Sequence, residues 1–358
     1  MKNIVLTGGG TAGHVTPHLA LLPHLITAGY QIHYIGTEKG MERGLMESQP
    51  GVIYHAVKTG KLRRYFSWQN LTDPFRVIAG AFEAYRILGQ IKPDIVFSKG
   101  GFVAVPVVAA AALRGIPVLA HESDLSPGLA NRISARFAGR VATAFPECAQ
   151  KLGEKGIHTG LPIREALFEG ERQRGLQLAG FKGDKPVVLV MGGSQGARAI
   201  NEALRRALPG LLPRMDILHL CGQGHLDPAF PDTRGYFQAE FLGKELPHAL
   251  AASDVILSRA GATAIFEFQA LRKPMLLVPY PKGASRGDQI ENANSLAARG
   301  LAHVLYQEEM TPQTLAQALI DLMGDARRLE GALEAAPPAD GRAAVMKLIG
   351  EMAAGRAL

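Results

Sequence analysis

Short apolar runs alternate along the chain with longer segments of helical periodicity. The runs in the first half are residues 4–6, 31–35, 95–97, 117–120 and 141–143, and those in the second half are residues 186–191, 217–220, 255–257 and 275–278. Helical patterns lie between them, for example over residues 17–28 and 78–90. Strands that alternate with helices are typical of parallel sheets built from right-handed crossovers. The pattern therefore predicts an α/β protein.

The two halves of the chain begin alike. The first apolar run leads into GGTAGH at Gly9–His14, and the first run of the second half leads into GGSQGA at Gly192–Ala197. A chain of 358 residues is too long for one ordinary core. We therefore expect two Rossmann-like, doubly wound domains, residues 1–163 and 164–339, joined near Gly160–Arg164. An alanine-rich helix at about 340–358 is expected to pack back on the first domain.

The net charge of +7 is distributed unevenly. Residues 1–163 hold 17 Lys and Arg against 10 Asp and Glu, whereas residues 164–358 hold 22 of each kind. The first half should therefore meet an anion, whether phospholipid headgroups, a pyrophosphate or nucleic acid. The segment KLRRYFSW at 61–68 mixes cations with aromatic side chains, which favours a membrane interface, although nucleic-acid binding and a solvated loop use similar residues. The predicted membrane contacts are Arg63, Arg64, Phe66 and Trp68.

Other features of the composition limit the class of protein. Hydrophobic residues make up 47% and charged residues 20%, which is typical of a soluble globular chain. Cys148 and Cys221 have neither a disulfide framework nor metal-ligand spacing, which indicates a reducing compartment. The opening residues lack a secretory signal, and the longest apolar run, Phe102–Leu113, is shorter than the ~20 residues of a membrane span. We expect a protein that lies on a membrane without crossing it.

Two glycine-rich segments follow predicted strands of the first half. Gly8–His14 allows a tight turn and close backbone approach to a phosphate at a helix N-terminus, or forms only a structural turn. Lys99–Phe102 has the same character. His14 is either a solvated cap or a general base in a ligand cleft. A dinucleotide-binding dehydrogenase is disfavoured because no acidic residue closes the second strand, after which Glu38 comes late.

Polar residues follow several other strands. His121–Asp124 comes after the run 117–120 and is either a functional cluster or an N-capping loop in which Asp124 or Ser126 caps the next helix. In the second half, small residues at 260–264 permit close backbone approach, and Glu267 is either a ribose ligand or a surface carboxylate. The segment 288–292 is expected to be a loop whose amide and carboxylate groups bind sugar hydroxyls.

Taken together, these segments resemble one family. GGGTAGHVTPHLA, SKGGFVAVP, HESDLSPGLANR, TGLPIR, GGSQGAR and SRAGATAIFE occur in the order found in the MurG-type glycosyltransferases. The resemblance covers nearly the whole chain. It implies a type B glycosyltransferase fold with two Rossmann-like domains facing across a cleft, the first for a lipid acceptor and the membrane, the second for the UDP-sugar. The implied reaction is transfer, with inversion, of N-acetylglucosamine from UDP-N-acetylglucosamine to undecaprenyl-pyrophosphoryl-N-acetylmuramoyl-pentapeptide in peptidoglycan synthesis.

The resemblance also implies roles for individual residues. His14 and Glu122 are the catalytic candidates. Residues expected to contact the donor are Thr11, Ala12, Gly13, Asp124, Arg164, Ser194, Gln195, Leu242, Ala262, Thr263, Ala264, Glu267 and Gln289. Among these, Leu242 matches the backbone that binds uracil, Glu267 the ribose ligand and Gln289 the sugar-hydroxyl ligand. Residues expected to form the acceptor and diphosphate loops are Gly10, Gly100, Gly101, Phe102 and Asn131.

The resemblance implies a peripheral protein on the cytoplasmic face of the bacterial inner membrane. Its expected partners are the UDP-sugar, the undecaprenyl-linked acceptor and an anionic membrane surface. No cofactor, metal or nucleic acid is expected, and no Asp-x-Asp metal site is evident.

Three departures from the family pattern bear on the acceptor. HESD replaces the HEQN that is frequent in the family, Asp288 replaces the first of paired glutamines, and Phe102 lacks the hydroxyl of the usual aromatic residue. The first change weakens the assignment of Asp124 to the donor, and together the changes are consistent with an altered acceptor. The alternative functions are another glycolipid synthase, a UDP-sugar epimerase, or a non-catalytic nucleic-acid binder.

Overall fold

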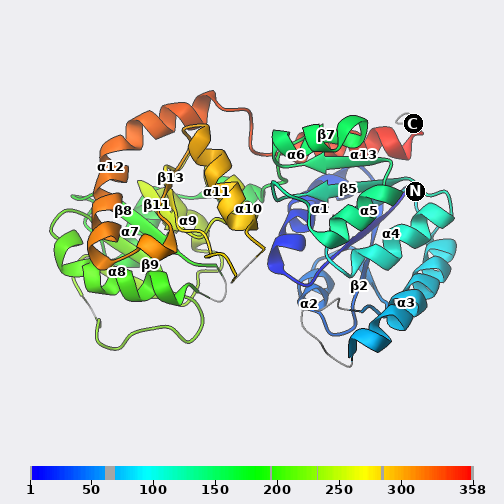
Figure 1. The fold of residues 1–358 in the computed structure, drawn as a ribbon, viewed down its shortest axis with the longest axis horizontal. Coiled ribbons are helices and arrows are strands. Elements are labelled where there is room, and N and C mark those ends of the chain that lie inside the picture. Colours follow the sequence, from blue (N-terminus) through cyan, green and yellow to red (C-terminus); the bar gives the residue numbers. More distant parts are fainter. Residues whose placement is uncertain (1, 61–68, 194–195, 232, 284–285, 356–358) are drawn as a thin grey trace. The chain divides into compact units, whose positions relative to one another are not determined.

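The computed structural model describes residues 2–60, 69–193, 196–231, 233–283 and 286–355, with the side chains of 69–75 left out. The chain divides into two compact units. Unit 1 consists of Met1–Arg164 with Ala339–Leu358, and unit 2 consists of Glu165–Pro338. Each unit is a parallel sheet covered by helices (Figure 1).

The sheet of unit 1 has seven strands in the order β3-β2-β1-β4-β5-β6-β7 within the described residues, and all neighbouring pairs are parallel. The strands are β1 Lys2–Gly8, β2 Tyr30–Gly36, β3 Val52–Ala56, β4 Ile95–Gly100, β5 Val118–Glu122, β6 Arg140–Thr143 and β7 Gly156–His158. From β1, the strands β2 and β3 extend the sheet in one direction, and β4 to β7 extend it in the other direction. The sheet therefore has a switch point between β1 and β4.

Successive residues of β1 enter two different cores because side chains alternate across a strand. Ile4 and Leu6 pack with residues of α1 (Thr16–Thr27) and α13 (Arg342–Ala353), whereas Val5 packs with residues of α3 (Gln69–Ile91) and α4 (Ala104–Leu113). The helices of this unit are α1 Thr16–Thr27, α2 Met41–Glu47, α3 Gln69–Ile91, α4 Ala104–Leu113, α5 Leu129–Phe137, α6 Pro146–Lys151 and α13 Arg342–Ala353, with 3₁₀ turns η1 Ala12–His14 and η2 Gly153–Lys155. The C-terminal helix α13 contacts α1, β4 and β5.

The sheet of unit 2 has six described strands in the order β10-β9-β8-β11-β12-β13, again parallel, with its switch point between β8 and β11. The strands are β8 Val187–Met191, β9 Asp216–Leu220, β10 Tyr236–Ala239, β11 Val255–Ser258, β12 Met275–Leu277 and β13 His303–Val304. The helices are α7 Arg172–Ala179, α8 Arg198–Leu211, α9 Leu246–Ala252, α10 Ala262–Ala270, α11 Asp288–Ala298 and α12 Pro312–Ala335, with η3 Glu165–Glu169 and η4 Gln307–Glu309. Leucines of α8 and α12 share one core with β8, β9 and β11.

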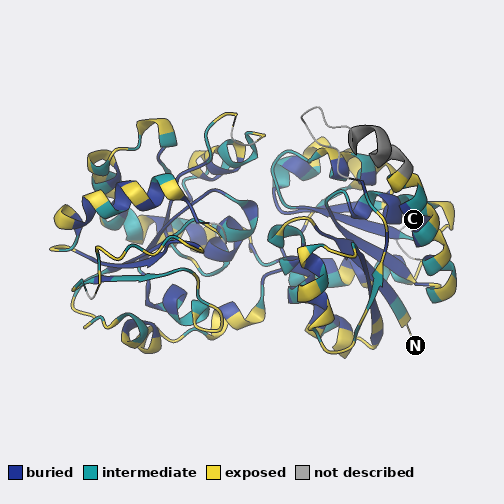
Figure 2. Ribbon diagram, turned by 90° about the horizontal axis from the view of Figure 1, so that it is seen from below, coloured by how far each residue is buried: buried dark blue, intermediate teal, exposed yellow. Residues whose placement is uncertain are grey.

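The predicted fold class of two doubly wound α/β domains is confirmed, and the central strands of both sheets are largely buried (Figure 2). Some local expectations were wrong. The segment 288–292 begins helix α11 and is not a loop. His121 and Glu122 are the last residues of β5 and do not follow it. Neither Asp124 nor Ser126 caps α5, whose N-cap is Gly128 without a side-chain bond.

Candidate functional site

The glycine-rich segments lie at the two switch points. In unit 1, Gly8–Gly10 ends β1 and Lys99–Gly101 ends β4, which are neighbouring strands. In unit 2, Gly192 follows β8 and Gly261 follows β11, which are also neighbours. Ligands of open parallel sheets bind outside the carboxyl ends of the strands, at the point where the strand order reverses. Each unit therefore has a candidate binding edge, and we describe the two separately.

His14 is held by the loop that follows β1. Its Nδ1 lies 2.9 Å from the carbonyl oxygen of Gly9 and 3.2 Å from Thr11 Oγ1. A carbonyl oxygen only accepts, so Nδ1 carries the proton and the lone pair of the neutral ring is on Nε2. Thr11 is exposed, and Ala12, Gly13 and His14 form the half-buried turn η1 that leads into α1. The interpretation of His14 as a solvated cap is therefore wrong, because its ring is hydrogen-bonded to the loop.

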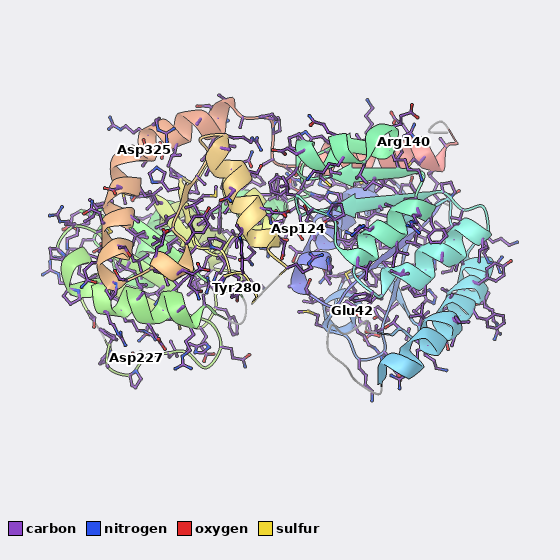
Figure 3. The ribbon with its side chains drawn as sticks, viewed as in Figure 1. Glu42, Asp124, Arg140, Asp227, Tyr280 and Asp325 are labelled. Atoms are coloured by element: carbon purple, nitrogen blue, oxygen red, sulfur yellow. The ribbon has the colours of Figure 1, made fainter. Side chains whose placement is uncertain are left out.

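A carboxylate that the sequence analysis missed lies beneath this loop. Glu42 of α2, which is labelled in Figure 3, is fully buried. Its Oε1 accepts from the backbone N–H and hydroxyl of Thr37 at 3.2 and 2.5 Å, and its Oε2 accepts from the N–H of Gly10 at 3.3 Å. The sequence signal for Glu42 is an acidic residue in the first turn of the helix that follows β2, although Glu38 is closer to the end of the strand. Glu42 joins the ends of β1 and β2.

A buried cation also escaped the sequence analysis. Lys99 of β4 is 1% exposed, and its ammonium donates to His121 Nδ1 at 3.1 Å and to the hydroxyl of Ser123. His121 Nε2 donates to the carbonyl of Gly160 at 3.0 Å, so His121 is neutral with its proton on Nε2. Burial lowers the pKa of Lys99 to about 8, although the charges of Glu122 and Asp124 act in the opposite direction. Burial and the Lys99 charge lower the pKa of His121 well below its usual value.

Glu122 is the second catalytic candidate and lies beside Lys99 at the end of β5. Its Oε1 accepts from the N–H of Asp124 at 2.9 Å, and its Oε2 accepts from Asn131 Nδ2 at 2.8 Å. Burial raises the pKa of Glu122, as does the charge of Asp124. The Asn131 side chain packs directly against Gly100, where a Cβ atom would overlap it. Glu122 and Asn131 also line a cavity of about 210 Å³ between β5 and α5.

The structure thus brings most of the predicted residues of unit 1 together. Gly10 is exposed at the tip of the first loop, and Gly101 adjoins that loop because a Cβ atom there would lie 3.1 Å from His14 Nδ1. Phe102, which follows β4, and Asp124, which follows β5, are both half-buried. The predicted membrane residues Arg63, Arg64, Phe66 and Trp68 lie outside the described residues.

In unit 2, a short connection, residues 259–261, leads from β11 to helix α10, with Gly261 as the N-cap of the helix. Ala262 is buried in its first turn, Thr263 and Ala264 are half-buried, and Glu267 is 7% exposed. The interpretation of Glu267 as a surface carboxylate is therefore wrong. Gln289 of α11 lies beside this helix start, with its Nε2 3.9 Å from the position of a Cβ atom on Gly261. Its Oε1 accepts from the N–H of Tyr280 at 3.2 Å.

The other predicted donor residues are spread over unit 2 and its boundary. Leu242 is half-buried in the segment that follows β10, next to the exposed Phe241. Arg164 is half-buried and is the last residue of the first part of unit 1. Ser194 and Gln195 lie outside the described residues, although Gly193 and Gly196 on either side are hydrogen-bonded to each other at 2.9 Å.

Arg259 is another residue that sequence reasoning passed over. Its guanidinium donates to the carbonyls of Val278 and Pro279 and to Gln307 Oε1, and it stacks on the ring of Tyr280. Arg259 follows β11 and bonds to the residues that follow β12, so it connects the ends of these two strands near the N-terminus of α10. Within the described ranges, no group of three or more His, Cys, Asp or Glu side chains could hold a metal ion.

The chain matches known proteins over nearly its whole length. Residues 4–143 match the glycosyltransferase family 28 N-terminal domain, and residues 187–346 match the family's C-terminal domain. The chain is 50% identical over 349 residues to the UDP-N-acetylglucosamine–N-acetylmuramyl-(pentapeptide) pyrophosphoryl-undecaprenol N-acetylglucosamine transferase of Geobacillus thermodenitrificans, covering 97% of this chain and 98% of that one. The crystal structure of Acinetobacter baumannii MurG matches with a TM-score of 0.77 and 30% identity, covering 98% of this chain and all of the other.

The same fold also occurs in proteins with other activities. A UDP-N-acetylglucosamine 2-epimerase matches with a TM-score of 0.64 over 99% of this chain and 93% of the other, but at only 14% identity, which shows the fold alone. The family models and the 50% identical relative are more specific. This chain belongs to glycosyltransferase family 28, as a member of its MurG-type branch.

Proposed function

We propose that this protein transfers N-acetylglucosamine from UDP-N-acetylglucosamine to an undecaprenyl-pyrophosphoryl-linked N-acetylmuramoyl-pentapeptide in peptidoglycan synthesis. The observation that carries the proposal is 50% identity, over 97% of the chain, to an enzyme named for this reaction. The two switch points supply a physical basis, because each presents glycine-rich strand ends at which backbone N–H groups can meet phosphate.

The reaction is a direct displacement with inversion. The acceptor hydroxyl attacks the anomeric carbon of N-acetylglucosamine, a new C–O bond forms, and the bond to the UDP oxygen breaks. The hydroxyl proton passes to His14 Nε2, which carries the lone pair because Nδ1–H is bound to the carbonyl of Gly9. Glu122, with Asn131, shapes the acceptor side at the end of β5.

The departing diphosphate gains negative charge, which the strand ends of unit 2 are suited to stabilise. Helix α8 begins after the second glycine-rich segment and α10 begins at Ala262, so both helix N-termini offer positive potential. Arg164, Ser194, Gln195 and the loop Thr11–Gly13 supply further donors in this scheme. The remaining donor ligands are Leu242 for uracil, Ala262–Ala264 for the diphosphate, Glu267 for the ribose and Gln289 for the sugar hydroxyls.

The acceptor is lipid-linked, so the enzyme must work at a membrane surface, which we place at the cytoplasmic face of the inner membrane. Among the described residues, no helix has the length and apolar character needed to cross a bilayer. Helix α3 presents Ile78 and Phe82, 67% and 65% exposed, on one face together with Tyr85. Arg114 stacks on Tyr85 with 3.7 Å between the guanidinium carbon and the ring centre. Exposed apolar side chains beside cations support docking on anionic lipid.

The membrane part of the proposal has its own test. Vesicles of anionic phospholipid should carry the protein upward in a flotation gradient, and a high salt concentration should release part of it because charge attraction is screened. Ile78→Ser with Phe82→Ser should weaken flotation. Ile26→Ser, which changes a 51% exposed residue of α1, is the matched control. Equal flotation of all variants would contradict docking through α3.

The reaction is tested with UDP-N-acetylglucosamine and a synthetic polyprenyl-pyrophosphoryl-N-acetylmuramoyl-pentapeptide. We expect release of UDP together with a lipid-linked disaccharide, and no UDP release when the acceptor is left out. Isomerisation of the UDP-sugar without an acceptor would instead indicate an epimerase. Transfer to a different glycolipid alone would retain the glycosyltransferase class and overturn the proposed acceptor.

A further inference from the structure

The buried carboxylate of Glu42 has no part in the reaction scheme above. It is fully buried beneath the loop that carries His14 and accepts three hydrogen bonds, two from Thr37 and one from the N–H of Gly10. Burying a charged group is costly unless it is well hydrogen-bonded. The loop ends are also anchored without it, because Tyr34 donates to the carbonyl of Gly8 at 2.7 Å and Tyr54 donates to the carbonyl of Thr37 at 2.6 Å. Anchoring of these loops therefore does not by itself explain a negative charge at Glu42.

Glu42 and His14 are connected through a single peptide group. The N–H of Gly10 and the C=O of Gly9 belong to the same peptide bond. Glu42 Oε2 accepts from its N–H at 3.3 Å, and its carbonyl accepts from His14 Nδ1 at 2.9 Å. Hydrogen bonds in a chain polarise one another, so a negative charge at the N–H end makes the carbonyl a better acceptor. The carboxylate thereby favours the tautomer with its proton on Nδ1.

The glycines around Glu42 and His14 leave space for these hydrogen bonds because they have no Cβ atom. A Cβ atom on Gly9 would lie 2.6 Å from the carboxyl carbon of Glu42, and one on Gly40 would overlap its Oε1. A Cβ atom on Gly101 would lie 3.1 Å from His14 Nδ1 and overlap the carbonyl oxygen of Gly9. Three glycines from three different segments therefore leave space for the path from Glu42 to His14. This accounts for glycine at these positions independently of any phosphate.

We propose that Glu42 is a positioning residue for His14 that acts through the Gly9–Gly10 peptide. It keeps the ring proton on Nδ1 and so leaves Nε2 to receive the proton of the acceptor hydroxyl. The proposal rests on the proposed function, in which His14 is the base.

Glu42→Gln is the main test, because it keeps the size of the side chain and removes its charge. The amide has one oxygen for donors that now reach two carboxylate oxygens, so at least one hydrogen bond is lost. We expect kcat to fall by about 10- to 100-fold, as when other groups that orient a functional histidine are removed. The KM for UDP-N-acetylglucosamine should stay unchanged. Glu47→Gln on the same helix, which changes a half-exposed carboxylate paired with Arg43, should leave both parameters unchanged.

A double-mutant cycle separates positioning from general damage. In a His14→Ala background, Glu42→Gln should cause no further loss of kcat, because the group it orients is absent. An equal fold-loss in both backgrounds, or a rise in KM with kcat unchanged, would overturn the positioning role. If His14→Ala by itself leaves kcat intact, the proposed base fails, which is a different outcome.

A measurement on the unaltered protein covers the case in which Glu42→Gln does not fold. Nitrogen-15 NMR of histidine-labelled protein, with the His14 signals assigned by their absence in His14→Ala, reports which ring nitrogen holds the proton. A neutral ring protonated on Nδ1 is expected. A ring protonated on Nε2 would overturn the proposal.

Discussion

Replacing Lys99 by methionine should change how the stability of the protein depends on pH. The Lys99 ammonium is buried at the end of β4 and donates to His121 and Ser123. Methionine has nearly the same length but carries no charge. The substitution therefore removes one buried titrating group without opening a large cavity.

The magnitude follows from the pKa. Burial lowers the pKa of Lys99 from 10.5 to about 8 in the folded protein, which corresponds to about 3 kcal/mol of free energy opposing the charged form. Below pH 8 the ammonium is charged in both states and this penalty is fully present. As the pH rises from about 8 towards 10.5, the folded state loses its proton before the unfolded state does. The Lys99 contribution to the free energy of unfolding should therefore increase by about 3 kcal/mol across this interval.

Urea unfolding of the wild type and of Lys99→Met, followed by circular dichroism between about pH 7.5 and about pH 10.5, measures this contribution as a difference. The difference is needed because other groups titrate in the same pH range in both proteins. Desolvation raises the pKa values of the half-buried Tyr54 and the buried Cys148, so their contributions to the free energy of unfolding fall as the pH rises. Lys347→Met, at an exposed position of α13, should parallel the wild type. If Lys99→Met also parallels the wild type, Lys99 is not a desolvated cation and the reasoning is refuted.

Three further substitutions test the site. His14→Ala should lower turnover by roughly 10²- to 10⁴-fold while UDP binding, measured by calorimetry, persists; unchanged turnover would remove His14 as the base. Glu267→Ala should weaken UDP-sugar binding, whereas Glu334→Ala, at an exposed position of the same unit, should not. If both variants bind the UDP-sugar with equal affinity, the assignment of Glu267 to the ribose is refuted. Gly101→Ala should lower kcat, because its Cβ would meet the carbonyl of Gly9 at a backbone φ of +81° that favours glycine; wild-type kcat would contradict that packing.

The pattern of apolar residues was sufficient to predict the fold class. Runs such as 4–6 and 187–191 are apolar at every position because parallel strands are buried on both faces. Short strands such as β3 and β13 were missed because they are only partly buried and so lack that signal. The ends of β4 and β5 were also misjudged, since Lys99 and Glu122 are charged yet continue their strands into the buried edge.

The glycine-rich loops and His14 were recognisable from the sequence because glycine in a strand-to-helix turn is a local feature. The groups that hold them were not recognisable, because their partners depend on the order of strands in the sheet. Placing β1 between β2 and β4 brings Gly9, Glu42 and Gly101 together from distant parts of the chain. The sequence alone determined which strand ends carry the glycine-rich loops. Only the tertiary structure decided that a buried carboxylate lies beneath one of them and a buried ammonium beside the next, because burial and hydrogen bonding depend on which segments the fold makes neighbours.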